Sequence, residues 1–269
     1  MHLVLKIGAK PIKREATMLL QDILNAYTNH PDFMKMVSIV PFMGGFLIWC
    51  YFYFLSVKDR KMPIPFWMYT FWFAHDATAA VVFYRLAEQH NGFWFFQSTW
   101  IMLVVWCVVE IVGMCLAVRF ARQDIWGKYF ASPVTKKQAT GWVLAEIAAM
   151  FAVVFLLRGL MDDDTMFKWF VLTNAVMAIG PFYLWRTRTD RTGSSIVLAI
   201  IFVIIVANNF SPPGIGMFTT ASPYFDQPWF YFAGVVLTLM TISNLFVLLR
   251  LPSKKAVEAK WQQSPAASR

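Results

Sequence analysis

The chain has 269 residues and a formal net charge of +9, with 58% of its residues hydrophobic and 14% charged. Roughly a quarter of the residues of a soluble globular domain are charged, so this composition excludes an ordinary soluble domain and indicates a membrane protein. The basic residues lie in short stretches between apolar runs, which favours contact with anionic lipid headgroups and argues against nucleic-acid binding.

Residues 1–36 precede the long apolar runs and are predicted to form an amphipathic N-terminal segment. In the stretch EATMLLQDILNAY, five apolar residues fall near one helical face: Met18, Leu19, Ile23, Leu24 and Tyr27. This pattern predicts a helix that lies on the membrane surface. The alternative is a partly ordered tail.

Residues 37–251 are predicted to form a seven-helix transmembrane domain, so the expected fold class is an all-α membrane protein. Charges, Pro or Gly bound each apolar segment. The segments cover roughly 38–57, 64–87, 93–118, 141–160, 165–185, 194–210 and 228–250. The connection between the last two segments predicts either an ordered cap over the bundle or a slack loop.

Residues 252–269 are predicted to form a polar C-terminal tail. Lys and Arg are concentrated in this tail and in the connections that follow the first, third and fifth segments. Cytoplasmic connections of membrane proteins carry an excess of Lys and Arg. We therefore expect the C-terminus in the cytoplasm and the N-terminus outside the cell or in a lumen.

Ionisable residues at membrane depth are rare and count as functional candidates. Asp76 lies in the middle of the second segment beside His75, Glu110 lies in the third segment, and Glu146 lies near the start of the fourth. We predict catalytic roles for these four residues. For the acids, the alternative is a protonated carboxyl group that only donates an interhelical hydrogen bond, and for His75 it is a packing role. His75 and Asp76 need not share a site, because neighbours in a helix point about 100° apart.

Two amides and three indoles are predicted to line a substrate-binding chamber around these acids. Asn174 is in the middle of the fifth segment and Asn244 is in the last. Asp76, Glu110 and Asn174 are expected to face one cavity whose mouth lies toward the cytoplasm. One helical turn before each of the three acids is a Trp, and aromatic walls can stabilise a carbocation: Trp72, Trp106 and Trp142. The alternative is that some of these Trp residues only mark the membrane interface.

No metal or cofactor is expected. Cys50, Cys107 and Cys115 lack the spacing of a zinc motif, and the Asp run 162–164 is interpreted as a solvated loop rather than a cation site. HExxH, Walker and GxSxG motifs are absent, and the last segment has no lysine for a retinal Schiff base.

Three stretches of the first half resemble the small seven-span terpene cyclases of fungal meroterpenoid and indole-diterpene pathways and their bacterial relatives. GGFLIWCYFYFLSVKDRK is similar to the first span of that family and its short basic turn. FWMYTFWFAHDATAAVVFYRL holds the place of the second span, and WCVVEIVGMCLAVRFARQDIW is similar to the third. In the third stretch, Glu110 and Trp126 match an Asn or Asp of the family and a Trp beyond the basic turn.

The resemblance implies that an acid in the second span protonates a terminal epoxide or alkene of a prenyl chain, after which the cation closes rings. Asp76 matches the position of that acid, and burial favours the protonated form that a proton donor needs. The family has Trp-Glu where this chain has His75-Asp76. The second acid of the family, in the last span, has no counterpart here, so Glu110 or Glu146 would have to replace it.

Two functions of different classes follow, with a lipid-binding scaffold or assembly factor without catalysis as a third possibility. The first is a membrane-embedded terpene cyclase or isomerase that protonates a prenyl-type lipid or meroterpenoid substrate, with membrane lipids as its surroundings. The second is a transporter for a small solute or protons, in which the same acids form a relay. A transporter would more often show breaks within its spans and an internal repeat, so the sequence favours the enzyme.

Overall fold

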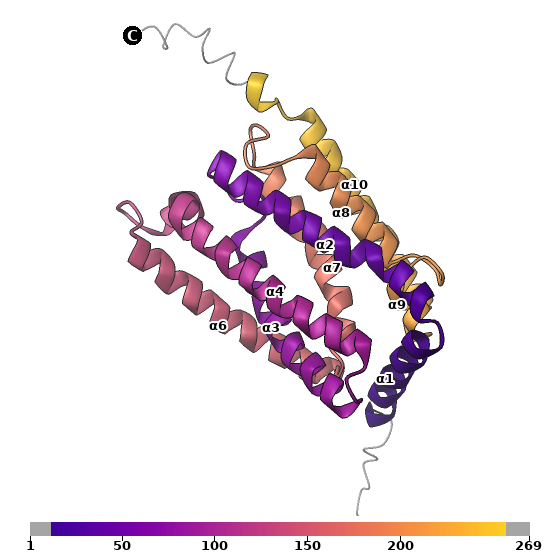
Figure 1. Ribbon diagram of the computed structural model, residues 1–269. Helices are drawn as coiled ribbons and strands as arrows, with labels where there is room; N and C mark the ends of the chain where they lie inside the picture. Colours follow the sequence, from indigo (N-terminus) through magenta and orange to yellow (C-terminus); the bar gives the residue numbers. More distant parts are fainter. Residues whose placement is uncertain (1–11, 257–269) are drawn as a thin grey trace, which may run out of the picture.

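The structure is a computed structural model that describes residues 12–256, so the expectations for residues 1–11 and 257–269 lie outside the described residues. The described part of the chain is all-helical (Figure 1). The helices are α1 Ile12–Asn29, α2 Pro31–Asp59, α3 Phe66–Gln89, α4 Trp94–Leu116, α5 Arg122–Trp126, α6 Lys136–Met161, α7 Phe167–Arg186, α8 Ile196–Asn209, α9 Met217–Ala221 and α10 Pro228–Arg250. A π-helical turn, Ala117–Ala121, joins α4 to α5, and a 3-10 turn, Gly127–Tyr129, follows α5.

Five helices among the described residues are long and apolar enough to cross a membrane: α2, α4 with its extension to Tyr129, α6, α7 and α10. The prediction of an all-α, multi-pass membrane protein is confirmed at this level, but a count of seven spans is not. The helix α8 has only 14 residues. The helix α3 has 24 residues, but polar side chains such as Thr70, His75 and Thr78 interrupt its apolar surface.

The first long helix begins earlier than expected. Residues 31–36, which we assigned to the N-terminal segment, are the first turns of α2. Pro31 occupies the start of the helix, where its missing N–H is not needed, and Asp32 lies in the first turn, where a carboxylate is favoured.

The central helix of the bundle is α3, which packs against α4, α6 and α7. Small residues on α3 such as Ala74, Ala79 and Ala80 are buried and allow the neighbouring helices to come close. The helices α2, α7 and α10 all pack against α8 (Figure 1). Because helices pack on several sides of α3, the polar residues in its middle, Thr70, His75 and Asp76, are buried within the protein.

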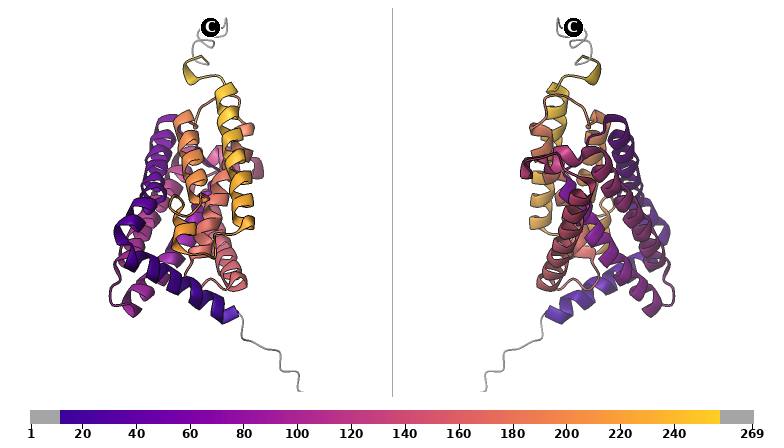
Figure 2. Two further views of the ribbon diagram at one scale, coloured as in Figure 1. Left: turned by 90° about the vertical axis from the view of Figure 1, so that its right-hand side faces the viewer. Right: turned by 90° about the vertical axis from the view of Figure 1, so that its left-hand side faces the viewer.

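The helix α1 lies across the end of the bundle that is opposite to the C-terminus (Figure 2). Leu19, Ile23 and Tyr27 are buried, whereas Met18 is 57% exposed. The hydroxyl groups of Tyr27 and Ser38 are 2.9 Å apart and hydrogen-bonded, which ties α1 to α2. The apolar face of α1 is therefore covered largely by the bundle, and a place on the membrane surface remains a prediction.

The connection between α8 and α10 is an ordered cap that contains α9, so the slack-loop alternative is wrong. The hydroxyl group of Thr219 donates to the carbonyl oxygen of Ser211 at 2.7 Å, and that of Ser222 donates to the Asp22 carboxylate at 2.5 Å. Met217 and Phe218 of α9 are the buried residues on the inner side of the cap. This cap closes the same end of the bundle that α1 crosses.

The expectation of a solvated loop for residues 162–164 is wrong for the middle residue. Asp163 is buried, and its carboxylate accepts hydrogen bonds from the N–H of Trp169 at 2.9 Å and the hydroxyl of Thr165 at 3.1 Å. The first N–H groups of a helix lack partners within the helix, so Asp163 satisfies the start of α7. Burial raises the pKa of this carboxyl group.

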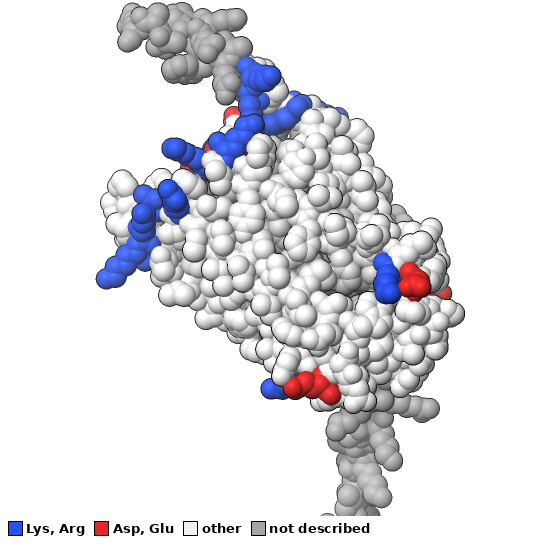
Figure 3. All heavy atoms as spheres, in the orientation of Figure 1, with Lys and Arg blue, Asp and Glu red and all other residues white. Residues whose placement is uncertain are grey.

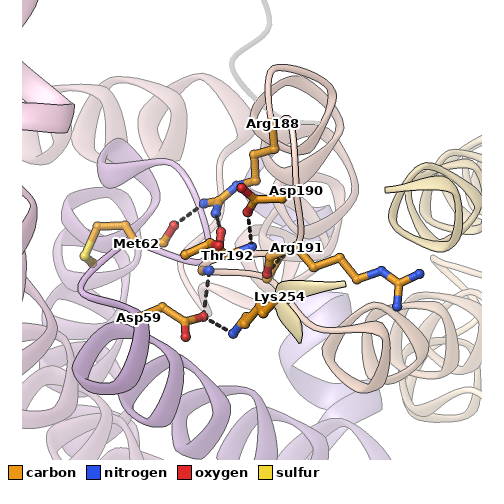
Figure 4. A network of polar contacts seen from close by, with 9 residues as sticks. Asp59, Met62, Arg188, Asp190, Arg191, Thr192 and Lys254 are labelled. Atoms are coloured by element: carbon orange, nitrogen blue, oxygen red, sulfur yellow. Dashed lines mark hydrogen bonds and ion pairs between the residues drawn. The ribbon is translucent and has the colours of Figure 1, made fainter. Parts of the chain in front are cut away.

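Lys and Arg gather at the end of the molecule near the C-terminus on the face that Figure 3 shows. A polar network at this end joins α2, the connection between α7 and α8, and the residues after α10 (Figure 4). Asp59 accepts from the N–H of Gly193 at 2.7 Å and from Lys254, and Arg188 donates to the carbonyl oxygens of Met62 and Thr192. We call these residues, with Asp190 and Arg191, the basic-end network.

Candidate functional site

A chamber lies within the bundle, between α2, α3, α4, α7, α8 and the cap helix α9. Its polar lining consists of His75, Asp76, Glu110, Thr173, Asn174 and Asn209. Its aromatic lining consists of Phe42, Trp49, Trp72, Phe95, Trp106, Phe167, Phe170 and Phe218. The free volume of the chamber is about 90 Å³, which is room for a few water-sized groups or the slim end of a chain.

Two carboxyl groups define the chemistry of the chamber. Asp76 of α3 and Glu110 of α4 are 5% and 0% exposed, and they are close enough to interact electrostatically. Neither carboxyl oxygen of Glu110 has a hydrogen-bond partner among the described residues. Carboxyl groups exchange protons with substrates in acid–base catalysis, so this pair is the candidate proton-transferring element of the chamber.

His75 also faces the chamber, although neighbours on a helix usually point apart. Its Nδ1 atom is 2.6 Å from Oδ1 of Asp76, and the ring packs edge-on against Phe170 with centroids 5.1 Å apart. Helix geometry does not require His75 and Asp76 to share a site, but the chamber extends around α3 far enough to include both. The Nε2 atom of His75 has no partner among the described residues.

The amide of Asn174 faces the acids from α7, and the structure adds Asn209 from the last position of α8. The Nδ2 group of Asn209 donates to Oδ1 of Asn174 at 2.6 Å. The Nδ2 group of Asn174 donates to the carbonyl oxygen of Phe170 at 2.9 Å. The prediction that Asp76, Glu110 and Asn174 face one cavity is confirmed, while their roles in a reaction stay predictions.

Trp72 and Trp106 contribute to the aromatic wall as expected. Trp72 lies edge-to-face with Trp49, with ring centroids 5.9 Å apart. The ring centroids of Trp106 and Phe42 of α2 are 6.3 Å apart. Several aromatic rings therefore surround the chamber in different orientations. The face of an aromatic ring attracts positive charge.

Three predicted site residues lie outside the chamber. Glu146 and Trp142 face a separate surface groove beside Trp67, because α6 contacts α3 on the side away from the chamber. Trp142 is 44% exposed and stacks on Tyr129 with centroids 5.6 Å apart.

Asn244 is buried, but both ends of its amide bind α7. Its Nδ2 group donates to the carbonyl oxygen of Ala178 at 3.0 Å, and its Oδ1 atom accepts from Arg186 at 2.8 Å. Asn244 therefore joins α10 to α7 and is not free to bind a substrate.

The lining residues place the chamber along the bundle, while a mouth toward the cytoplasm stays a prediction. The lining includes the first residue of α7, the last residue of α8, and Met217 and Phe218 of the cap. The chamber therefore extends toward the end that carries α1 and α9, away from the basic-end network, because the polar residues of α7 and α8 lie at that end.

Sequence reasoning missed Asn209, Trp49 and Phe218. Asn209 ends an apolar run next to Asn208, and a polar pair at the end of a run is the usual sign of a membrane edge. Its burial and its hydrogen bond to Asn174 of α7 show that Asn209 points inward.

The described residues contain no group of three or more His, Cys, Asp or Glu that could hold a metal ion, and the absence of a metal stays a prediction. In comparisons with protein-family models, characterised proteins and solved structures, nothing matched this chain.

Proposed function

We propose that this chain is a membrane-embedded acid catalyst, a terpene cyclase or isomerase that protonates an alkene or epoxide of a prenyl-type lipid. The observation that carries the proposal is the pair of buried carboxyl groups, Asp76 and Glu110, which faces an aromatic chamber. The likeness of the first three apolar segments to seven-span terpene cyclases points the same way.

The proposed reaction begins with proton transfer from the carboxyl pair to a substrate carbon or epoxide oxygen. Asp76 remains the preferred donor, with Glu110 beside it as the group that returns the proton. The positive charge on the substrate is stabilised by the faces of Trp49, Trp72 and Trp106. Loss of a proton from a neighbouring carbon to the carboxylate ends the reaction, so an isomerisation or cyclisation balances without a co-reactant.

The size of the chamber bears on which of these reactions occurs. A double-bond shift at the slim end of a chain fits the free volume of about 90 Å³. A folded, multi-ring product needs more space, which displacement of the α9 cap would provide. Isomerisation or closure of one ring is therefore the form of the proposal that the present geometry supports best.

The membrane arrangement is part of the proposal. A helix of 24 residues such as α3 is about 36 Å long, which exceeds the roughly 30 Å hydrocarbon core of a bilayer. With α3 and the shorter α8 added to the five membrane-length helices, the bundle has seven spans. The concentration of Lys and Arg near the C-terminal end supports a cytoplasmic C-terminus and an external or lumenal N-terminus.

The test is product formation in heavy water. Purified protein in lipid nanodiscs is incubated in D₂O with farnesol, geranylgeraniol and their terminal epoxides, and products are identified by mass spectrometry. The proposal predicts isomerised or cyclised products, with one deuterium on carbon where an alkene was protonated. Unchanged substrates together with proton or solute flux in liposomes would instead support the transporter alternative.

A further inference from the structure

The chamber has a second polar element that the proposed proton transfer does not use. Asn174 and Asn209 are 4% and 2% exposed, and both line the chamber. They come from α7 and α8, whereas the carboxyl pair comes from α3 and α4. A ligand within the chamber therefore meets an acid from one pair of helices and an amide from another.

The orientation of both amides is fixed by their hydrogen bonds. The carbonyl oxygen of Phe170 can only accept, so the group of Asn174 at 2.9 Å from it is the NH₂. This leaves Oδ1 of Asn174 to accept from the NH₂ of Asn209 at 2.6 Å. The remaining atom, Oδ1 of Asn209, is an acceptor by elimination, and it is buried without a partner among the described residues.

A buried acceptor without a partner is costly, so a donor supplied by a ligand would be bound strongly there. The chamber lining contains no Lys or Arg, and its one basic side chain, His75, is already bonded to Asp76. A diphosphate placed in this space would lose its hydration without gaining a counter-charge. The ligand that complements the lining is uncharged and carries one hydrogen-bond donor.

We infer that Asn209 Oδ1 accepts a hydrogen bond from a hydroxyl group of the substrate, so that the Asn174–Asn209 pair selects a prenyl alcohol over the corresponding ether or diphosphate. The inference rests on the proposed function for the prenyl part of the ligand. It makes Asn209 the specificity-determining residue of the chamber, and it places the hydroxyl group at the amide pair and a double bond near the acids.

The experiment compares three probes that share one prenyl chain: farnesol, farnesyl methyl ether and farnesyl diphosphate. Binding to the protein in nanodiscs is measured by quenching of tryptophan fluorescence, since Trp49, Trp72 and Trp106 line the chamber. We expect the wild type to bind farnesol about tenfold more tightly than the methyl ether, which is the size of effect of one hydrogen bond to an otherwise unpaired buried acceptor. Farnesyl diphosphate is expected to bind most weakly.

Three variants locate the preference. Asn209→Leu is expected to reduce the preference for the alcohol; because it also frees Oδ1 of Asn174, the double variant Asn174→Leu/Asn209→Leu is the one expected to bind the alcohol and the ether equally, near the affinity of the wild type for the ether. Asn208→Leu is the matched control: it changes the neighbouring residue of the same helix, which does not line the chamber, and should keep the preference. If Asn209→Leu fails to fold, the comparison of the three probes on the wild type decides by itself.

The same comparison with the Asp76→Asn variant separates this inference from the proposed function. A preference for the alcohol that persists in Asp76→Asn supports the role of Asn209 whether or not the acids catalyse a reaction. Equal binding of alcohol and ether by the wild type, tighter binding of the diphosphate, an unchanged preference in Asn209→Leu, or no binding of any probe would each overturn the inference.

Discussion

The chamber and the basic-end network are both polar regions, yet their hydrogen bonding differs. At the basic end, Asp59 and Arg188 bond to the backbone of segments distant in sequence, and Asp190 accepts from the nearby N–H of Thr192 (Figure 4). In the chamber, both oxygens of Glu110, Nε2 of His75 and Oδ1 of Asn209 have no hydrogen-bond partner within the part of the chain that the structure describes. Buried polar groups are normally bonded, so unpartnered ones need a reason. The difference suggests that the basic end stabilises the fold and that the chamber is built for a ligand.

The basic end also has one unpartnered group, because Nε of Arg188 has no hydrogen-bond partner in residues 12–256. The other guanidinium nitrogens of Arg188 are bonded to the carbonyl oxygens of Met62 and Thr192. One unpaired N–H on a bonded side chain contrasts with Glu110, a whole carboxyl group without a bond. Mutations in the chamber should therefore lower activity with little loss of stability, and mutations at the basic end should lower stability with little loss of activity.

The largest effect is expected from removing the acids. Asp76→Asn and Glu110→Gln keep size and polarity but cannot supply an acidic proton, so turnover should fall at least ~100-fold while the proteins still fold. Asp76→Glu restores the residue type of the terpene cyclases that this chain resembles and should retain part of the turnover. Activity is measured by product formation in nanodiscs, and folding by thermal unfolding.

The matched control for both acids is Glu146→Gln. This carboxyl group also lies on a membrane-length helix but faces a groove outside the chamber, so its loss should leave turnover unchanged. If Glu146→Gln were as inactive as Asp76→Asn, the chamber would not be the site of the reaction.

The second effect concerns stability at the basic end. Arg188→Ala removes two charge-assisted hydrogen bonds, each worth roughly 1.5–3 kcal/mol: one to the carbonyl oxygen of Met62 between α2 and α3, and one to that of Thr192 within the α7–α8 connection. The melting temperature should fall markedly, while the folded fraction keeps its turnover. A loss of turnover without a change in melting temperature would contradict the structural role, and Arg188→Lys should be intermediate.

A smaller effect is expected at the contact of α1 with α2. Tyr27→Phe removes the hydroxyl group that bonds to Ser38 at 2.9 Å but keeps the ring stacked on Phe95 at 3.7 Å. The loss should be about 1 kcal/mol, the net value of one hydrogen bond. Tyr27→Ala also removes the stacking and should cost more. Chemical denaturation of the two variants in detergent gives the comparison, and equal losses would show that the hydroxyl group alone matters.

The smallest effect is the acid sensitivity of the basic end. The hydrogen bonds from Thr192 lower the pKa of Asp190. Its contribution to stability is therefore present above the ordinary pKa of an aspartate and is lost as the pH falls through the lower, folded-state value. Asp190 lies near the surface, so solvent weakens the effect. Melting curves between about pH 2 and pH 5 should show a slightly smaller acid loss for Asp190→Asn than for the wild type; a larger loss would reverse the sign.

Much of the fold could be predicted from hydropathy, because long apolar runs report directly on membrane helices. The sequence also singled out Asp76, Glu110 and Asn174, since polar residues inside such runs face protein. The same reasoning wrongly placed Glu146 and Asn244 in the chamber. Hydropathy does not tell which face of α6 meets α3, or that Arg186 and Ala178 bind both ends of the Asn244 amide.

Asn209 was not predicted as a site residue, but it lines the chamber. Its position at the end of an apolar run gave it the appearance of a boundary residue, yet it is the amide whose acceptor is free inside the chamber. The difference between a boundary residue and a lining residue depends on how α8 rotates against α7, which is a property of packing and not of local sequence.

The central claim is that the Asp76–Glu110 pair holds a proton that it can give to a substrate. Infrared spectroscopy tests it most directly, because a protonated carboxyl group has a C=O stretch that is distinct from carboxylate bands and shifts in D₂O. At neutral pH we predict such a band in the wild type and in Glu146→Gln, and its loss in the double variant Asp76→Asn/Glu110→Gln. A band that persists in the double variant, or its absence from the wild type, would contradict the account.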